Sequence, residues 1–286
     1  DLHLSIRRQR QMCIRDRYDR YDRSGGLLIY GIPNFKLEKF VVQRRIKILK
    51  AGGIKFKNNF EVGQNISLDE LRKKHDSILI ATGVYKPREI EISGNRLKNI
   101  FPAMDFLVAS NRKGLGDKVK DFDSGILNAQ NKKVVVIGGG DTAMDCVRTA
   151  VRQNAKSVQC LYRRDKENMP GSAREVNNAE EEGVEFVWLS NPKKFIGDSK
   201  VSAVIVEKIK LTNPDSSGRK KPEPVPNSEY EIKADMIIKA LGFDPEDLPK
   251  LFDSKDLLIS KWGTIKINQV TMETNLEGIF AAGDIV

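Results

Sequence analysis

The chain has 286 residues and carries 49 lysines and arginines against 39 aspartates and glutamates, a formal net charge of +10. With hydrophobic residues at 40%, it fits a globular protein with a substantial core and roughly two domains. Its longest apolar runs are too short to span a bilayer, so we expect a cytoplasmic protein with no membrane partner. Two histidines, three cysteines and the lack of a Cys-x-x-Cys motif argue against a metal or iron–sulfur site within this sequence.

The start of the chain is unlike the rest. Arg7 to Arg17 reads Arg-Arg-Gln-Arg-Gln-Met-Cys-Ile-Arg-Asp-Arg, and one legal set of codons for it looks like a transposase sequencing adapter. We therefore predict that residues 1–17 are an adapter artefact joined to a truncated gene, are disordered and stand outside the fold. The alternative is a basic amphipathic arm, which is disfavoured because the peptide has no apolar face at helical or strand spacing.

Removing this segment changes the charge argument. Arg7 to Arg17 holds five arginines and one aspartate, a net charge of +4, so the remaining chain is only mildly basic. Nucleic-acid binding needs a basic stripe with interleaved aromatic residues. The other basic cluster, Arg219-Lys220-Lys221, lies among turn-forming residues and indicates a solvated hairpin loop. We expect no nucleic-acid partner.

The residues after this segment have the pattern of a strand that ends beside a nucleotide. Tyr18-Asp19 can close a strand with an acid at its tip, where the carboxylate could hold a ribose. A flexible turn follows and contains Gly25, Gly26 and Leu27. Alone, such a segment is more often plain α/β core than a nucleotide site.

Two further segments have the form of a buried strand that runs into small residues. Ser77–Ile80 leads into Thr82 and Gly83, where a nucleotide could lie close to the backbone. Near the end, an apolar run leads into Gly283 and Asp284, whose carboxylate can accept hydrogen bonds from ribitol or ribose hydroxyls. Each of these signals is also weak when taken alone.

The middle of the chain carries a stronger signal. The β-branched run Val134–Ile137 is followed by Gly138-Gly139-Gly140-Asp141-Thr142 and then by a helical stretch. Glycines in this order let the backbone turn tightly and approach a pyrophosphate, which then lies against the first free amides of the helix. Ala143 occupies the third small-residue position of the G-x-G-x-x-G/A motif, where helix packs on strand. The pattern predicts a dinucleotide site.

The residues at the end of the next predicted strand indicate which dinucleotide binds. About twenty residues after the glycines, NAD enzymes place an acid on the ribose, whereas NADP enzymes place an arginine on the 2′-phosphate. Here Tyr162 leads into Arg163 and Arg164. A guanidinium suits a phosphate, so we predict NADPH rather than NADH. The alternative is a plain glycine turn followed by solvated arginines.

In this order, these motifs resemble the small (beta) subunit of NADPH-dependent glutamate synthase, within the FAD/NAD(P)-binding oxidoreductase superfamily. The resemblance covers Tyr18 to Val286. The glycine turn, Ala81-Thr82-Gly83 and Gly283-Asp284 are shared by many flavoproteins with two dinucleotide sites. Much more specific are the run from Gly25 to Lys39 and the run Asn168-Met169-Pro170-Gly171-Ser172.

The resemblance implies an α/β protein with two Rossmann-like three-layer domains, the NADPH domain being inserted into an incomplete FAD domain. The FAD domain would comprise residues 18–128 and 242–286, and the NADPH domain residues 129–241. Polar residues 117–131 suit the connection between them. The second half of the insert fits antiparallel strands in the β-rich runs 184–189, 201–211 and 230–240.

Roles for individual residues also follow from the resemblance. Asp19 would bind the FAD ribose, Gly25, Gly26 and Leu27 would pass beside the flavin nucleotide, and Asp284 would meet the ribitol. Gly138 to Thr142 would hold the NADPH pyrophosphate, with Arg163 and Arg164 on the 2′-phosphate. Hydride transfer between the two rings needs no acid or base from the protein, so we expect no catalytic side chain.

The resemblance implies an electron-input subunit that passes hydride from NADPH to FAD, and electrons on through iron–sulfur centres to a large subunit making glutamate from glutamine and 2-oxoglutarate. The family's cysteine-rich domain and first FAD fingerprint have no counterpart here, so we expect clusters only in a missing N-terminal part. We also expect the chain as printed to hold flavin weakly and to be inactive. The alternatives are another NADPH–FAD reductase module, serving ferredoxin or a pyrimidine-reducing enzyme, and a non-catalytic NADPH-binding domain.

Overall fold

The computed structural model describes residues 15–214 and 220–286. Most of the segment that resembles an adapter, and part of the expected basic hairpin, lie outside these ranges. The described chain forms two compact units. The first unit comprises residues 15–29, 38–87 and 243–286, and the second comprises residues 30–37 and 88–242. Among the described residues, no helix is both long enough and apolar enough to cross a membrane.

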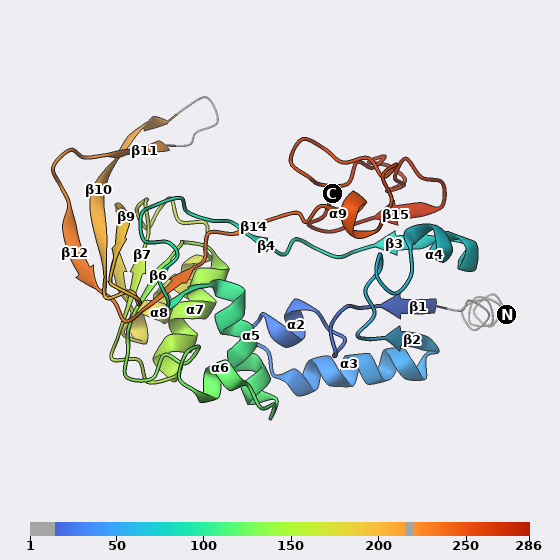
Figure 1. The fold of residues 1–286 in the computed structure, drawn as a ribbon, viewed down its shortest axis with the longest axis horizontal. Helices are drawn as coiled ribbons and strands as arrows, with labels where there is room; N and C mark the ends of the chain where they lie inside the picture. Colours follow the sequence, from blue (N-terminus) through green and yellow to red (C-terminus); the bar gives the residue numbers. More distant parts are fainter. Residues whose placement is uncertain (1–14, 215–219) are drawn as a thin grey trace. The chain divides into compact units, whose positions relative to one another are not determined.

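A five-stranded parallel sheet forms the centre of the second unit (Figure 1). Its strands, in spatial order, are β5 (Ile100–Pro102), β13 (Met236–Lys239), β6 (Lys133–Ile137), β7 (Ser157–Leu161) and β8 (Glu185–Val187). All neighbouring pairs are parallel. The residues of β13, and those of β6 after its first residue, are buried, as expected for parallel strands covered on both faces.

Helices cover one face of this sheet (Figure 1). They are α5 (Ala103–Gly114), α7 (Asp141–Arg152) and α8 (Ala173–Glu181), and the short helix α6 (Lys120–Asp123) packs beside α5. Phe106 of α5 and Met144 of α7 are fully buried in one hydrophobic cluster with Val134 and Val136 of β6. Helix α7 packs so closely because the small Ala143 side chain faces the sheet, as the glycine-turn motif predicts.

An antiparallel layer covers the opposite face (Figure 1). It consists of β9 (Ser190–Ile196), β10 (Ala203–Pro214), β11 (Lys220–Pro224) and β12 (Tyr230–Lys233), the other three strands each pairing with β10. Val135 and Ile137 of β6 point into this layer and pack with Phe195 and Val204. The alternation along β6 therefore joins the two faces into a three-layer unit, which confirms the predicted α/β fold class.

The antiparallel prediction is wrong for one of its three runs and for the second half of another, because β13, within residues 230–240, pairs in parallel with β5 and β6. Residues 184–189 contain β8, which pairs in parallel with β7. Residues 230–240 divide at Ala234-Asp235, where the Asp235 carboxylate accepts a hydrogen bond from the Lys133 amide and the chain passes from β12 to β13. A β-rich run indicates a strand but does not say which strand it joins.

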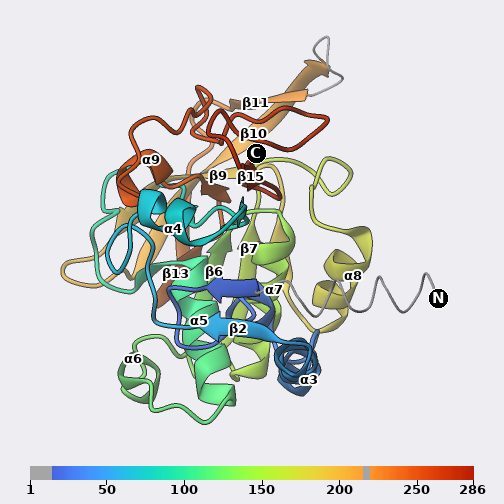
Figure 2. The ribbon, with the colours of Figure 1, turned by 90° about the vertical axis from the view of Figure 1, so that its right-hand side faces the viewer.

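The first unit contains three two-stranded sheets. The pairs are β1 (Arg15–Tyr18) with β2 (Ile54–Lys57) and β3 (Ile78–Ile80) with β15 (Ile279–Ala281), both parallel, and β4 (Lys86–Pro87) with β14 (Phe243–Asp244), antiparallel. Figure 2 shows β1 and β2 side by side. The helices are α2 (Leu27–Tyr30), whose last residue belongs to the second unit, α3 (Lys39–Ala51), α4 (Leu68–Lys74) and α9 (Leu248–Leu251).

The compact units differ from the predicted domain boundaries in several places. Residues 30–37, predicted as part of the FAD domain, group with the second unit. Residues 88–128, predicted as part of the FAD domain, group with the second unit because β5 pairs with β13 and α5 packs on β5, β13 and α7. Residues 15–17, predicted as part of the disordered adapter segment, form β1 together with Tyr18. Which cofactor each unit binds stays a prediction at this point.

Candidate dinucleotide site

The glycine turn between β6 and α7 contains three glycines with different surroundings. A Cβ atom added at Gly138 would lie 2.2 Å from the Ala240 carbonyl oxygen, and the φ angle of +148° also disfavours a side chain. At Gly139, an added Cβ would lie 2.3 Å from the Tyr162 ring. At Gly140, no heavy atom of the described chain lies within 4 Å of an added Cβ. The fold fills the space beside the first two glycines and leaves the third open.

The first turn of α7 is arranged to receive an anion. Gly140 is the N-cap and offers no side chain, so no side-chain oxygen occupies the helix end. The Gly140 carbonyl accepts from the amides of Ala143 and Met144, whereas the amides of Asp141 and Thr142 make no hydrogen bond within the described residues. Free amides at the positive end of a helix dipole are the usual cradle for a phosphate.

A loop from the specific run 168–172 lies on this turn. The Gly171 amide donates to the Gly139 carbonyl at 2.9 Å, and the Ser172 amide donates to Asp141 Oδ1 at 3.0 Å. The Tyr162 hydroxyl donates to the Asn168 carbonyl at 3.2 Å. In the sequence, this run supports the resemblance and indicates no site role. The structure makes it one wall of the site, and no local pattern predicts that contact.

The two arginines predicted to select NADPH follow β7 at the same edge of the sheet. The parallel register joins the two strand ends, because the Gly138 amide donates to the Leu161 carbonyl at 3.1 Å. Arg163 is exposed and makes no ion pair within the part of the chain that the structure describes. Arg164 is half-buried, and its Nε donates to the Lys220 carbonyl at 3.4 Å. Of the two, Arg163 has its whole guanidinium in solvent, whereas Arg164 has one guanidinium donor engaged with the backbone.

Lys239, on the other side of β6, was missed in the sequence. It is the last residue of β13 and pairs in register with Ile137, directly before the glycine turn. Its side chain is 7% exposed and forms an ion pair with Glu89. The chain passes from β6 to β7 on one side and reaches β13 on the other, so this is a topological switch point, where open α/β sheets bind ligands. The only signal in sequence is a lysine that ends an apolar run.

In the first unit, Asp19 lies just past the carboxyl end of β1. Asp19 Oδ1 accepts from the Tyr21 amide at 3.1 Å. Burial raises the pKa of this carboxyl, partly offset by the Tyr21 hydrogen bond and by Arg17 and Arg20. Arg20 forms an ion pair with Glu246 at 3.0 Å. The acid therefore sits in a polar, half-buried position at the strand tip, as the sequence predicts.

The predicted small residues of the first unit share a neighbour that the sequence did not indicate. Added Cβ atoms at Gly26 and Gly83 would lie 3.7 Å and 3.8 Å from the Tyr85 side chain, so these two glycines flank one ring. Gly26 has φ of +52°, which favours glycine. Gly25 packs against α3, and Leu27 is 41% exposed.

The strands β3 and β15 bring the remaining predicted residues to one edge. The Ala282 amide donates to the Ile80 carbonyl at 3.0 Å, so Thr82 lies beside the segment that contains Gly283 and Asp284. The Asp284 and Thr82 side chains are exposed. Among the described residues, Asp19 accepts its hydrogen bond from the Tyr21 amide, and Asp284 lies exposed after β15.

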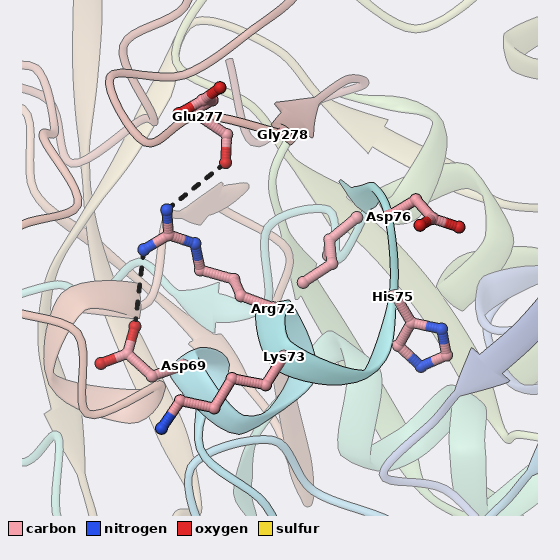
Figure 3. Close-up of a pocket in the computed structure, with 8 residues that line it drawn as sticks. Asp69, Arg72, Lys73, His75, Asp76, Glu277 and Gly278 are labelled. Atoms are coloured by element: carbon pink, nitrogen blue, oxygen red, sulfur yellow. Dashed lines mark hydrogen bonds and ion pairs between the residues drawn. The ribbon is translucent and has the colours of Figure 1, made fainter.

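A cavity of about 600 Å³ lies at the opposite ends of these strands. Figure 3 shows its charged lining, in which Arg72 reaches the Glu277 carbonyl at 3.5 Å and Asp69 at 3.7 Å. Its wall includes Ile78, where β3 begins, and Gly278, just before β15. Because nucleotides bind at the carboxyl ends of parallel strands, this cavity is not the predicted flavin site. Among the described residues, no three metal-binding side chains gather at one point.

Comparisons with known proteins show the family to which this chain belongs. Residues 32–286 match the family model described as pyridine nucleotide-disulphide oxidoreductase. The glutamate synthase (NADPH) small chain of Azospirillum brasilense is 57% identical over 269 residues, which cover 94% of this chain and 56% of that protein. The corresponding small chain of Escherichia coli K12 is 42% identical over 277 residues and is covered to 58%. The resemblance predicted from the sequence is confirmed, and the chain spans little more than half of these relatives.

A solved structure supports the fold. FprA from Mycobacterium tuberculosis in complex with NADPH superposes with a TM-score of 0.75 at 18% identity, covering 94% of this chain and 71% of that one. At this identity the match shows a shared fold.

Proposed function

Because the chain belongs to the pyridine nucleotide-disulphide oxidoreductase family, we propose that its second unit binds NADPH and its first unit contributes to an FAD site. One observation carries the NADPH half of the proposal. Gly140 opens onto space at the end of α7, where the Asp141 and Thr142 amides have no partner among the described residues. A pyrophosphate supplies the charge and the acceptors that this helix end requires.

The 2′-phosphate is assigned to Arg163, with Arg164 beside it. Arg163 stands at the carboxyl end of β7, one strand away from the glycine turn, with its guanidinium in solvent. Charge-assisted hydrogen bonds to phosphate are worth roughly 1.5–3 kcal/mol, and NADH lacks this group. Selectivity for NADPH therefore follows from one or two side chains.

The opposite side of the glycine turn is assigned to the nicotinamide half. With the adenosine end at β7, the rest of the dinucleotide would continue across β6 towards β13. Lys239 ends β13, and its buried ammonium can donate to the ribose hydroxyls or the carboxamide. Glu89 holds that ammonium in place from the neighbouring segment.

The residues of the first unit fit part of an FAD site. Asp19 offers a carboxylate at a strand tip, and Gly26 and Gly83 leave the backbone bare on both sides of Tyr85. Asp284, exposed at the end of β15, can accept from a ribitol hydroxyl. When bound together, NADPH and FAD supply a hydride donor and acceptor. The protein contributes position and electrostatics, so we assign no catalytic acid or base.

For the whole protein we propose the electron-input role of a glutamate synthase small chain, with iron–sulfur centres and a large-subunit partner supplied outside these 286 residues. The relatives' names support this proposal. Electrons would pass from NADPH through FAD to the partner, which forms glutamate from glutamine and 2-oxoglutarate.

The experiment has two steps. The purified chain is first titrated with NADPH and with NADH, and NADPH is expected to bind more tightly by roughly 10- to 150-fold. FAD and a dye acceptor are then added and NADPH oxidation is followed. Dye reduction shows an enzyme, and binding without reduction shows a nucleotide-binding module. Equal affinity for both nucleotides contradicts the assignment of Arg163.

A further inference from the structure

The segment Tyr30–Leu37, which we call the strap, is fastened to the second unit although the chain on both sides of it belongs to the first. Asn111 on α5 is 5% exposed, and its amide Nδ2 donates to the carbonyls of Tyr30 at 2.8 Å and Gly31 at 3.3 Å. A buried side-chain amide used on two backbone carbonyls fixes the first end of the strap.

The second end is fastened by charge. Lys36 Nζ lies 2.8 Å from Asp145 Oδ1 on α7 and 3.3 Å from Glu175 Oε2 on α8. Asp145 is only 8% exposed, and burial raises the pKa of its carboxyl while Lys36 lowers it. An apolar side chain could fill this position on a helix face. A buried carboxylate that is paired with a lysine from a distant segment specifies one binding position (the seat) for that segment on α7 and α8.

Two arginines complete the seat. Arg148 donates to Glu175 at 2.7 Å and to Glu182 at 2.6 Å, so it links the first and last turns of α8 to α7. The Phe35 ring of the strap lies under both guanidinium groups, 4.9 Å from Arg148 and 3.8 Å from Arg152. The strap thus contributes one cation and one aromatic ring to a single network on α7 and α8.

The same network reaches the glycine turn by two short routes. Along α7, Asp145 lies one helical turn after Asp141, the residue that follows Gly140. Along α8, Glu175 lies in the first turn, and the N-cap Ser172 donates its amide to the Asp141 carboxylate. A pyrophosphate at the end of α7 would repel the Asp141 carboxylate. The hydrogen bond from the Ser172 amide, at the start of α8, would then hold this carboxylate in place.

We propose that Lys36 couples the strap to the dinucleotide site: NADPH at the glycine turn stabilises the seated strap, and the seated strap raises the affinity for NADPH. This inference rests on the proposed NADPH function. By thermodynamic linkage the two effects are equal in size. In the chain, the strap follows the segment that contains Gly25, Gly26 and Leu27.

Hydrogen exchange and nucleotide titration on the full chain test this coupling. In the wild type, saturating NADPH should slow amide exchange in residues 30–37 by roughly fivefold or more. Lys36→Met should lower the affinity for NADPH by the same factor and make amide exchange in the strap independent of NADPH. Lys36→Arg, which keeps the cation, should restore both effects. Lys113→Met is the matched control, because it removes an exposed ion pair with Asp123 elsewhere in the second unit.

A second variant guards against misfolding. Lys36→Met alone leaves the Asp145 charge buried without its cation, so Lys36→Met combined with Asp145→Asn removes both charges. This double variant should fold, bind NADPH more weakly than wild type and show no NADPH effect on the strap.

Three outcomes separate the possibilities. The coupling is overturned if the double variant binds NADPH as tightly as wild type does, or if NADPH does not change amide exchange in the strap of the wild type. Either result leaves the NADPH site standing. A wild-type chain that binds no NADPH overturns the proposed function and this inference together. The coupling is also contradicted if Lys36→Met binds NADPH more weakly and Lys36→Arg does not restore the affinity. The positive charge at position 36 would then not be what couples the strap to the site.

Discussion

The three glycines of the turn should respond very differently to substitution by alanine. At Gly138 a methyl group would meet the Ala240 carbonyl at 2.2 Å with φ at +148°, so overpacking and backbone strain together should destabilise the fold by roughly 3 kcal/mol or more. At Gly139 the methyl would meet the Tyr162 ring, which is 7% exposed, and we expect a loss of roughly 1–3 kcal/mol.

Gly140→Ala should separate binding from stability. No described atom lies within 4 Å of the added methyl. Alanine is a poorer N-cap than glycine but restricts the unfolded chain more, so the stability should stay within about 1 kcal/mol of wild type. The methyl occupies the place assigned to the pyrophosphate. A steric cost of roughly 1–3 kcal/mol there weakens NADPH by about 5- to 150-fold.

Urea unfolding and fluorescence titration with NADPH measure the two effects on the same samples. Gly114→Ala is the control, since an added Cβ at this open position in α5 also has no neighbour within 4 Å and no nucleotide is assigned to it. If Gly140→Ala binds NADPH as tightly as wild type does, the pyrophosphate does not approach this glycine, and the reading of the turn is refuted.

Three further predictions address other parts of the second unit. Arg163→Ala should weaken NADPH by roughly 10- to 150-fold and leave NADH unchanged, whereas Arg164→Ala should have a smaller effect because Arg164 already donates to a backbone carbonyl; titration of both nucleotides checks this. Hydrogen bonds from Arg152 and Arg148 lower the pKa of Glu182 from 4.5 to about 2, so this stabilisation, about 2 kcal/mol after solvent screening, should be present above pH 4.5 and lost as the pH falls towards 2. Urea midpoints of wild type and Glu182→Gln across that range should converge at low pH, and a constant gap would contradict the assignment. Ser172→Ala removes the N-cap hydrogen bond to the Glu175 amide and should cost about 1 kcal/mol in thermal unfolding.

The features predicted well from the sequence are those encoded locally. The turn at Gly138 and the helix after it depend on residues a few positions apart, so the spacing of glycines and an apolar run is enough to identify them. The position of Arg163 just after β7 follows because the motif fixes where the next strand ends, whereas its binding of a 2′-phosphate stays a prediction. In the first unit, Asp19 directly follows β1, and this position was predicted from the few residues before it.

The features that were missed depend on contacts between distant parts of the chain. Lys36 and Asp145 are 109 residues apart, and Lys239 and Glu89 are 150 apart, so no periodicity relates them. The position of Tyr85 was not predicted, because its ring lies between two glycines, Gly26 and Gly83, and Gly26 is distant from it in the chain. The run 184–189 was assigned correctly as a strand and wrongly as antiparallel, because residue preferences do not specify the partner.

The central claim is a dinucleotide site that recognises the 2′-phosphate. Calorimetric titration of the purified chain with 2′,5′-ADP and with 5′-AMP tests it most directly, because the two ligands differ at the phosphate assigned to Arg163 and neither needs a flavin. We predict measurable binding of 2′,5′-ADP that is lost in Arg163→Ala, with 5′-AMP bound weaker by roughly tenfold or more. Equal binding of the two ligands, or no effect of the substitution, would contradict the account.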